Sequence, residues 1–390
     1  MRNRLAPILN LVEHTGKLKP LTDRRPVASL PFACRYRLID FPFSSLYNAE
    51  AVSAALFIAG SGHSLYDHIR SGSTWGLDSF AGGGVFTHSQ VKLKSDQNVE
   101  SKYDKFYYED HYNYVTRSKA EYVVMMGSSF LSNIQLESVL HFHEDKNSQV
   151  TVVYKQVNRE ELVEDTVYTA LNLNNGETDT VKGIEPVSGM ASGTKLNVNM
   201  EMMLLSKKVF LDYLFRAKQH DMDISVNTFI QFTLDSNESV NAYEYTGYLR
   251  VIEDVKSYFD ANMDMLDQDN FNALFYRADP VRTRAKNSAP TYYGEEAVIE
   301  NAQFANDCEV YGTVRNSVIF RKVSIEKGSV IEDSIIMQDS CIEEDVTLKH
   351  VILDKHVYVM KGAKLEGTPD NPIVIAKNSV VYPEGITKEG

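Results

Sequence analysis

Short apolar runs alternate with amphipathic stretches through residues 1–270. Four runs bounded by polar or glycine-containing turns predict β-strands: Leu5–Val12, Val52–Ala59, Glu121–Met126 and Val150–Lys155. Between the last two runs, Ser132–Asp145 carries its apolar side chains at helical spacing, which predicts a helix. Strand, helix and strand in this order favour parallel pairing in an α/β domain. Ligand chemistry would then lie beyond the carboxyl ends of the strands, in the turns after Val12 and Met126.

From Tyr292 onward the helical pattern ends and short β-branched runs recur with polar corners. A step of six residues joins small or aliphatic side chains in one column: Val318, Ser324, Val330, Ile336, Ile342 and Leu348. A period of six favours a hexapeptide β-helix, in which each coil buries its aliphatic corner on the next. An antiparallel sheet also satisfies this period and stays open as an alternative, although hairpin turns such as Asn-Gly are missing. The predicted divisions are therefore an α/β domain (1–270), a connector (271–291) and a β-helix (292–390).

Composition and charge exclude several classes of protein. The 390 residues are 43% hydrophobic and 24% charged, which is typical of a globular chain. A net charge of −13 argues against nucleic acid or an anionic membrane as partner, because both require a dominant positive field. Three scattered cysteines do not form a disulfide framework, and neither a signal peptide nor an 18-residue apolar run is present. We therefore expect a cytoplasmic protein.

Five segments, in order along the chain, resemble glucose-1-phosphate adenylyltransferase (ADP-glucose pyrophosphorylase): Arg35–Phe41 (RYRLIDF), Ser44–Ala51 (SSLYNAEA), Gly62–Ile69 (GHSLYDHI), Ser257–Leu266 (SYFDANMDML) and Ser334–Asp339 (SIIMQD). The resemblance implies a nucleotidyltransferase-like (Rossmann-like) domain with a mixed sheet, followed by a left-handed parallel β-helix. It also implies the reaction of that family, in which ATP and glucose 1-phosphate give ADP-glucose and pyrophosphate.

The phosphate loop of this family, G-G-x-G-x-R-L-x-P-L-T, is not reproduced. Counting back from Pro20, its glycines fall on Val12, Glu13 and Thr15, and its arginine falls on Lys17. Glycine lets the backbone take positive φ and approach a triphosphate closely, which a β-branched valine does not. A glutamate in this loop would direct a carboxylate at an anion. The loop is therefore not expected to bind ATP in the manner of the family.

The two metal-binding aspartates of the family are also replaced. The first belongs to G-D-H, where this chain reads Gly127-Ser128-Ser129. The second falls on Val251, although a shifted alignment would bring Glu253 or Asp254 to that position. Neutral serine and apolar valine are poor ligands for Mg²⁺. In addition, the base-contacting G-T-A-D-A falls on Tyr103–Tyr107, and the sugar-phosphate lysine falls on Pro186.

A retained scaffold with lost chemistry resembles the regulatory-type subunit of bacterial ADP-glucose pyrophosphorylases. The resemblance implies a heterotetramer with a catalytic subunit in glycogen biosynthesis, no catalytic residue here and no cofactor required by this subunit. Two alternatives stay open. One is an active adenylyltransferase that holds Mg²⁺ through Glu13, Glu253 or Asp254. The other is a hexapeptide acyltransferase, for which His350 and His356 are the histidines available in the β-helix.

A basic island lies between Lys17 and Arg37, where six basic residues accompany one acid, Asp23. Arginine pairs its planar fork with phosphate oxygens, so Arg25, Arg35 and Arg37 are candidates for binding a phosphorylated metabolite effector. By resemblance, the basic residue that matches Arg35 contributes to effector response. A solvated or domain-bridging basic face is an equally weighted alternative.

Two further clusters favour packing over chemistry. His63 and His68 are five residues apart, which fits the i, i+4 spacing of helical metal ligands poorly. The acids Asp104, Glu109 and Asp110 lie in a tyrosine-rich stretch that is typical of a helix with an aromatic face on the core.

Overall fold

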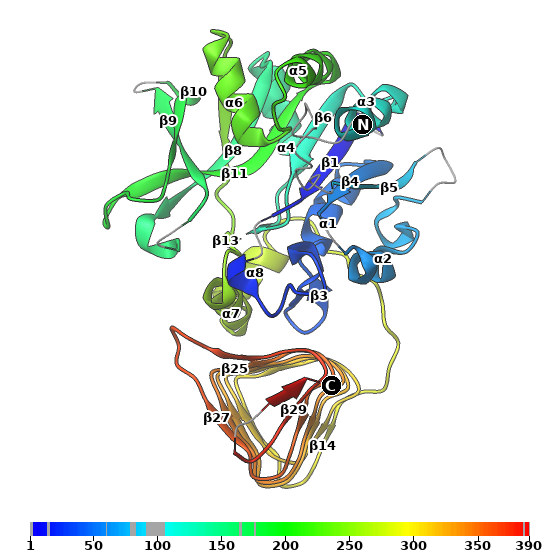
Figure 1. Cartoon of the computed structure of the whole chain (residues 1–390), viewed down its shortest axis with the longest axis vertical. Helices are drawn as coiled ribbons and strands as arrows, with labels where there is room; N and C mark the ends of the chain where they lie inside the picture. The colour runs from blue at the N-terminus through cyan, green and yellow to red at the C-terminus, as the bar shows by residue number, and fades with distance from the viewer. Residues whose placement is uncertain are drawn as a thin grey trace, which may run out of the picture.

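The chain folds into an α/β domain resting on a triangular β-helix, as shown by the computed structural model in Figure 1. The structure describes residues 3–13, 16–59, 61–78, 83–90, 106–163, 166–174, 177–384 and 387–389. Thr15, Asp104 and residues 103–105 of the predicted base-contacting stretch lie outside these ranges.

A nine-stranded mixed sheet forms the centre of the α/β domain. Its order is β5 (Gly84–Ser89), β4 (Ser53–Ile58), β1 (Leu5–Leu11), β6 (Tyr122–Met126), β11 (Lys195–Ser206), β8 (Val150–Asn158), β12 (Val240–Glu244), β10 (Glu177–Pro186) and β9 (Thr169–Asn174). The four predicted strands are β1, β4, β6 and β8, and β1 pairs in parallel with both β4 and β6. The predicted parallel pairing of β6 with β8 is wrong, because β11 lies between these two strands and pairs antiparallel with each.

In the described part of the chain, three helices cover each face of this sheet, whose strands bury side chains on both faces because successive side chains point to opposite sides. On β1, Leu5 and Leu9 belong to one apolar cluster while Ala6 and Ile8 belong to the other. The first face packs on α1 (Asp40–Asn48), α2 (His63–Ile69) and α4 (Leu136–Asp145), and the second on α3 (Phe106–Arg117), α5 (Lys207–Gln219) and α6 (Val226–Asp235). Helix α4 confirms the helix predicted within Ser132–Asp145, and α3 packs one aromatic face on the core as predicted, with Tyr108 and Tyr114 buried and Tyr112 exposed.

Small strands connect this domain to the helices that adjoin the β-helix. β2 (Pro31–Phe32) pairs with β3 (Tyr36–Arg37), and β7 (Phe130–Leu131) pairs with β13 (Arg250–Val251). Helices α7 (Val255–Met263) and α8 (Gln268–Phe275) follow β13, and residues 276–291 then run without helix or strand to the first coil.

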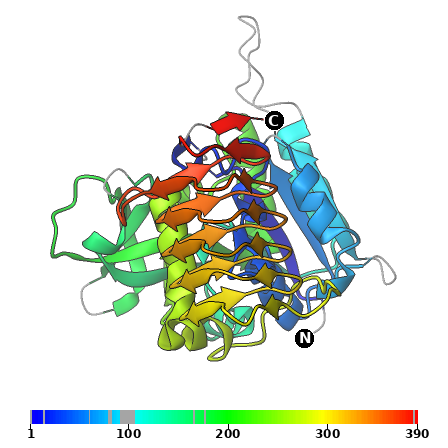
Figure 2. The same cartoon turned by 90° about the horizontal axis from the view of Figure 1, so that it is seen from below.

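The C-terminal part is a parallel β-helix whose coils stack in Figure 2. One wall contains β14 (Tyr292–Tyr293), β17 (Glu309–Val310), β20 (Ser324–Ile325), β23 (Cys341–Ile342), β26 (Tyr358–Val359), β29 (Ser379–Val381) and β30 (Thr387–Glu389). The second contains β15 (Val298–Glu300), β18 (Thr313–Arg315), β21 (Val330–Glu332), β24 (Thr347–Lys349) and β27 (Lys364–Glu366). The third contains β16 (Gln303–Phe304), β19 (Val318–Ile319), β22 (Ile335–Ile336), β25 (Val351–Leu353) and β28 (Ile373–Ile375).

The stacking interval is 15 residues between the first two coils of the second and third walls, 17 in the middle coils and 22 at the last, never the 18 of a strict hexapeptide repeat, which corrects the predicted columns. Ile325 lies on Ile342, which lies on Val359, and Ile331 lies on Leu348. A column of constant step six therefore slips by one residue per coil, and Ser324 and Val330 are less buried than their neighbours. The parallel pairing between coils excludes the antiparallel alternative for this wall-to-wall stack.

The two parts share one apolar core. It joins Phe32, Phe41 and Tyr258 of the α/β part to Val318 and Phe320 of the β-helix. The connector is fastened as well, because Ser44 Oγ accepts the backbone N–H of Arg282 at 2.8 Å and Trp75 Nε1 donates to its carbonyl at 3.2 Å. The β-helix is therefore packed against the first domain rather than tethered to it.

Among the helices in the described ranges, none is both long and apolar enough to cross a membrane.

Candidate functional site

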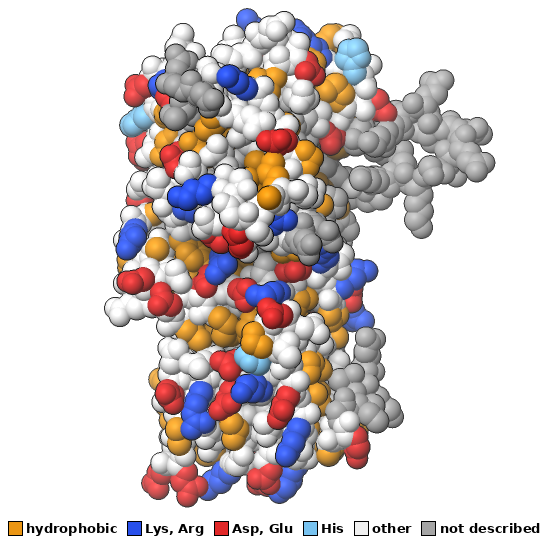
Figure 3. Space-filling view, turned by 90° about the vertical axis from the view of Figure 1, so that its left-hand side faces the viewer, with side chains coloured by type: hydrophobic (Ala, Val, Ile, Leu, Met, Phe, Trp, Pro, Cys, Tyr) orange, Lys and Arg blue, Asp and Glu red, His pale blue; other side chains and the backbone are white. Residues whose placement is uncertain are grey.

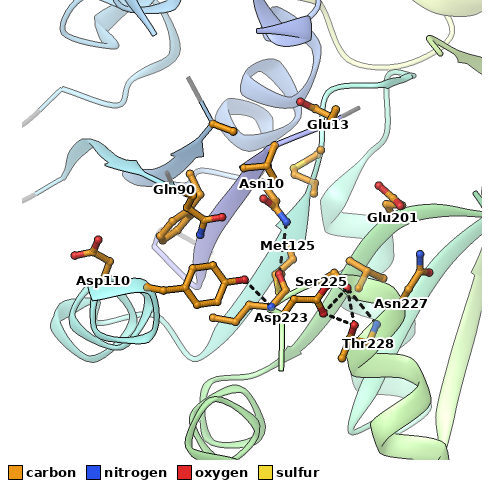
Figure 4. Close-up of a pocket in the computed structure, with 18 of the residues that line it drawn as sticks. Asn10, Glu13, Gln90, Asp110, Met125, Glu201, Asp223, Ser225, Asn227 and Thr228 are labelled. Carbon is orange, nitrogen blue, oxygen red and sulfur yellow. Dashed lines mark hydrogen bonds between the residues drawn. The ribbon is translucent and has the colours of Figure 1, made fainter. Parts of the chain in front are cut away.

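A cavity of about 800 Å³ opens at the carboxyl ends of β1, β4 and β6, where the sequence predicts ligand chemistry (Figure 4). Its described lining contains four carboxyl groups, from Glu13, Asp110, Glu201 and Asp223, and neither lysine nor arginine. Phosphate binding in a cleft relies on cations and on free backbone N–H groups. The described walls of this cavity therefore lack the side chains that would neutralise a triphosphate.

Glu13 lies after β1, at a position where the phosphate loop of the resembled family has a glycine. Its Oε1 accepts the backbone N–H of Ser128 at 2.8 Å and the Ser128 hydroxyl at 2.6 Å. Neither Val12 nor Glu13 takes positive φ, so the glycine geometry of the family is not reproduced at these described positions. A carboxylate of the chain itself thus binds the donors that follow β6.

The residues at the two metal positions do not fit Mg²⁺. The Ser128 hydroxyl donates a hydrogen bond to Glu13, and Val251 is an apolar residue of β13 that packs in the core. The shifted candidates are engaged elsewhere: Glu253 accepts a hydrogen bond from Thr166, and Asp254 caps α7 by accepting the Ser257 N–H at 2.7 Å. Within the residues that the structure describes, no group of three His, Cys, Asp or Glu side chains is placed to hold a metal ion.

Other positions singled out by the resemblance lie apart from one another. Tyr107 lines the cavity and its hydroxyl accepts the Ile224 N–H at 2.8 Å. Pro186 is exposed at the end of β10 and does not belong to the lining. The histidines of the acyltransferase alternative, His350 and His356, occupy positive-φ corners of the β-helix, close to Asp333 and Asp339 respectively.

Burial shifts the carboxyl groups of the cleft toward their neutral forms. It raises the pKa of Glu201 to about 7, and the nearby Glu13 adds to the shift. Burial likewise raises the pKa of Glu13, against the opposing effect of the Ser128 hydrogen bonds. The pKa of Glu253 rises to about 6 for the same reason. A raised pKa reduces the negative charge of Glu201 near neutral pH but supplies no positive charge for an anionic ligand.

The raised pKa of Glu201 predicts how the folding stability of the chain depends on pH. A carboxyl group with a higher pKa in the folded state binds its proton more tightly there, so its contribution is lost as pH rises from about 4.5 to about 7. The E201Q variant removes this titration. Its melting temperature should therefore fall less than that of the wild-type chain between pH 5 and pH 7.5, as measured by thermal denaturation. A wild-type and variant pair with parallel pH curves would contradict this assignment.

A second cavity, of about 630 Å³, lies between the α/β part and the β-helix. Its described lining contains no aspartate or glutamate, and it gathers cations from four separate segments: Arg35, Arg37, Arg284, Lys286, Arg321 and Lys355. On the face shown in Figure 3, by contrast, acidic and basic side chains are interspersed. The cavity is therefore a local positive site in a chain of negative net charge.

The three predicted arginines have different surroundings. Arg35 and Arg37 line this cavity, and Arg37 donates from Nη1 to the Ser64 carbonyl at 2.5 Å. Arg25 does not belong to the lining; its Nη2 donates to Asp354 of the β-helix at 2.5 Å and its Nε donates to the Leu21 carbonyl at 2.7 Å. Arg25 thus bridges the domains, which is the alternative given for the basic island.

Burial, and then neighbouring cations, lower the pKa values of three groups in this cavity. Burial lowers the pKa of Lys355 to about 6, helped by Arg37 and Arg25. Burial and Arg321 lower the pKa of Lys286 to about 8, and burial lowers that of Arg37 to about 10. A polyanion bound here would relieve this repulsion.

Unused donors add to the cavity. Arg321 Nε and Ser288 Oγ are buried, line it and find no hydrogen-bond partner among the described residues. His68 Nδ1 is also buried there without a partner among these residues. His68 is held by its other nitrogen, since Nε2 lies 2.5 Å from Oδ1 of the buried Asp40. No metal role for His68 is needed to explain this arrangement. Sequence reasoning missed Arg284, Lys286, Arg321 and Lys355, because single cations in a connector and a β-helix give no local signal.

Two families match the chain, one in the α/β part and one over the β-helix. The nucleotidyl transferase family matches residues 15–163. The GlmU-like, C-terminal hexapeptide family matches residues 287–386, which contain the stacked coils.

Curated relatives extend the match over nearly the whole chain. It is 32% identical to the "Glycogen biosynthesis protein GlgD" of Geobacillus stearothermophilus over 382 residues, covering 97% of this chain and 98% of that protein. The GlgD protein of Bacillus subtilis is 28% identical, with 97% of each chain covered. The "Glucose-1-phosphate adenylyltransferase" of Clostridium novyi is 25% identical, with 81% of each chain covered. The chain therefore belongs to the ADP-glucose pyrophosphorylase family, as a relative of the glycogen biosynthesis protein GlgD.

Proposed function

We propose that this chain is a regulatory, catalytically degenerate subunit that acts at the ADP-glucose step of glycogen biosynthesis in the cytoplasm. In this proposal it assembles with a catalytic ADP-glucose pyrophosphorylase subunit, as a heterotetramer, and requires no cofactor of its own. The observation that carries the proposal is the contact between Glu13 and Ser128, which places a carboxylate where the family binds phosphate.

The interdomain cavity supports the regulatory part of the proposal. A phosphorylated metabolite would meet guanidinium and ammonium groups from both domains there, together with buried donors that need acceptors. Since Arg37 belongs to the α/β part and Arg321 to the β-helix, a ligand that joins them would couple the two parts. Effector binding is thus separated from the cleft in which the family performs its chemistry.

The first coil of the β-helix supports an assembly role. Its strands β14 and β15 are edge strands of their sheets, and they expose Tyr292, Tyr293, Val298 and Ile299. At the other end, β30 pairs antiparallel with β29. An edge strand with exposed apolar side chains is a surface that proteins usually cover. A partner subunit that packs on this coil would bury it.

Assays of the chain alone and with its catalytic partner test the proposal. Alone, with ATP, glucose 1-phosphate and Mg²⁺, it should form ADP-glucose at least about a thousandfold more slowly than the catalytic subunit, because phosphate and metal contacts are missing. Mixed with that subunit, it should co-purify and change the rate or the effector response. Substantial turnover by the chain alone would end the proposal.

The active alternative makes a different prediction for the same assay. If Glu253 and Asp254 held Mg²⁺, the E253A/D254A variant would lose activity by orders of magnitude. Their engagement with Thr166 and Ser257 instead predicts a loss of folding stability without any change in turnover.

A further inference from the structure

We propose that Lys355 is a site of covalent acylation, and that it takes an acyl group from a small acyl phosphate bound in the interdomain cavity. The proposal deepens the regulatory role, because it rests on that cavity as a site for phosphorylated metabolites. An acyl phosphate carries both a phosphate for the cations and a carbonyl carbon for the amine. Acylation would remove the positive charge of Lys355 from the site.

Arg321, Gln338 and Lys355 form a column at one corner of the β-helix, and all three line the cavity. They follow β19, β22 and β25 at the same place in successive coils, because these strands stack in parallel register. Neighbouring strands lie about 4.8 Å apart, so the backbones of Arg321 and Lys355 are about 10 Å apart. A phosphate held by Arg321 would therefore leave the acyl end of a small ligand near Lys355.

The amine of Lys355 lies among cations, and the neighbouring acid is engaged elsewhere. Lys355 is 7% exposed and lines the cavity, and its Nζ is not sealed from solvent as Nε of Arg321 is. Asp354 accepts Arg25 Nη2 at 2.5 Å and the backbone N–H of Lys355 at 2.7 Å. These surroundings favour the neutral form of the amine.

The neutral form is the nucleophilic one. Burial, with Arg37 and Arg25, lowers the pKa of Lys355 to about 6, so most of this amine is unprotonated at pH 7. An exposed lysine, with a pKa of about 10.4, is less than about a thousandth unprotonated at the same pH. A bound dianion raises the pKa of Lys355, but burial persists in the complex and keeps the unprotonated fraction above that of an exposed lysine.

The reaction is a simple acyl transfer. The Lys355 nitrogen attacks the carbonyl carbon and forms a new N–C bond. The bond between that carbon and the bridging oxygen breaks, and the oxygen leaves with the electron pair as inorganic phosphate. The nitrogen loses one proton to water, so the products are an amide and phosphate. Cations of the cavity would stabilise the charge that develops on the leaving oxygen.

Acetylation of the full-length chain by acetyl phosphate tests the proposal, with peptide mass spectrometry giving the rate at each lysine. At pH 7, Lys355 should react at least about tenfold faster than Lys364, an exposed lysine of β27 that serves as the internal control. R321A should slow Lys355 by about tenfold or more and leave Lys364 unchanged, because a charge-assisted hydrogen bond to phosphate is lost. Arg321 is not one of the groups that shift the pKa of Lys355, so this variant tests recognition of the phosphate.

The neutral ester p-nitrophenyl acetate is the matched reagent control, because it carries the same acyl group without phosphate. Its reaction with Lys355 should be the same in R321A and in the wild type. Excess pyrophosphate should protect Lys355 of the wild-type chain from acetyl phosphate, and this measurement keeps the test informative if R321A fails to fold.

Three results would overturn the proposal. They are a reaction of Lys355 with acetyl phosphate no faster than that of Lys364, a faster reaction at Lys286 than at Lys355, and a rate at Lys355 that neither R321A nor pyrophosphate changes. Failure of the regulatory role is seen separately, in the assay with the catalytic subunit, so the two outcomes are distinguishable.

Discussion

The R25M variant is expected to have a free energy of unfolding about 3–5 kcal/mol lower than that of the wild-type chain, because it leaves a buried carboxylate without its partner. The side chains of Arg25 and Asp354 are 6% and 4% exposed, and their atoms lie 2.5 Å apart across the domain boundary. Methionine retains most of the packing volume but donates neither to Asp354 nor to the Leu21 carbonyl. Urea denaturation followed by circular dichroism measures the loss.

Two further variants separate the charge from the packing. In R25M/D354L both charges are absent, and most of the lost stability should return, since apolar replacements of buried ion pairs are often neutral or stabilising. K361A breaks the exposed pair of Lys361 with Glu344 on the β-helix and should leave the denaturation midpoint unchanged. An R25M midpoint equal to that of the wild type would show that this ion pair does not join the domains.

Removal of single cations from the interdomain cavity should weaken the binding of small polyanions. With pyrophosphate as the probe, K286A and R321A should each weaken binding by about tenfold or more, because a charge-assisted hydrogen bond contributes about 1.5–3 kcal/mol. The control K327A removes an exposed lysine of the β-helix that pairs with Glu296 outside the cavity. Calorimetry on the purified chain measures all three, and equal affinities in K286A and the wild type would contradict the site.

Proton uptake gives a second signature of the same binding event. The pKa of Lys355 is lowered to about 6, so most of this amine is neutral at pH 7. A bound polyanion raises that pKa, and the amine then takes a proton from solution. The binding enthalpy should therefore depend on the ionisation enthalpy of the buffer, and K355M should reduce this dependence. A buffer-independent enthalpy in the wild type would place the ligand elsewhere.

The elements of the fold could be predicted from local pattern, but their pairing could not. Apolar runs locate β1, β4, β6 and β8 to within a few residues. The antiparallel insertion of β11 between β6 and β8 depends on a strand that comes later in the chain, and no local spacing encodes that order. In the β-helix, residues at positive φ such as Asp333 and His350 form tight corners, and the middle coils shorten to 17 residues. A repeat of six could not reveal this shortening.

The candidate sites divide in the same way. Departures from the phosphate loop pointed to Glu13, whose contact with Ser128 explains why the cleft is unsuited to a triphosphate. The arginines of the basic island divide between the two predicted roles. Arg35 and Arg37 line a cavity that could bind a ligand, while Arg25 bridges the domains. Its counterparts, Lys286 and Lys355, lie some hundreds of residues away in sequence, and only the packing of the β-helix on the α/β part brings them together.

The shared apolar core has a practical consequence for dissecting this molecule. Phe32 and Tyr258 share one apolar cluster with Val318 and Phe320, so removing either half would expose a large apolar surface on the other. A protease that nicks residues 276–291 would cut the backbone without releasing a fragment. The solenoid is therefore not a detachable module, and swapping it between relatives would succeed only if the matching face of the first half travelled with it.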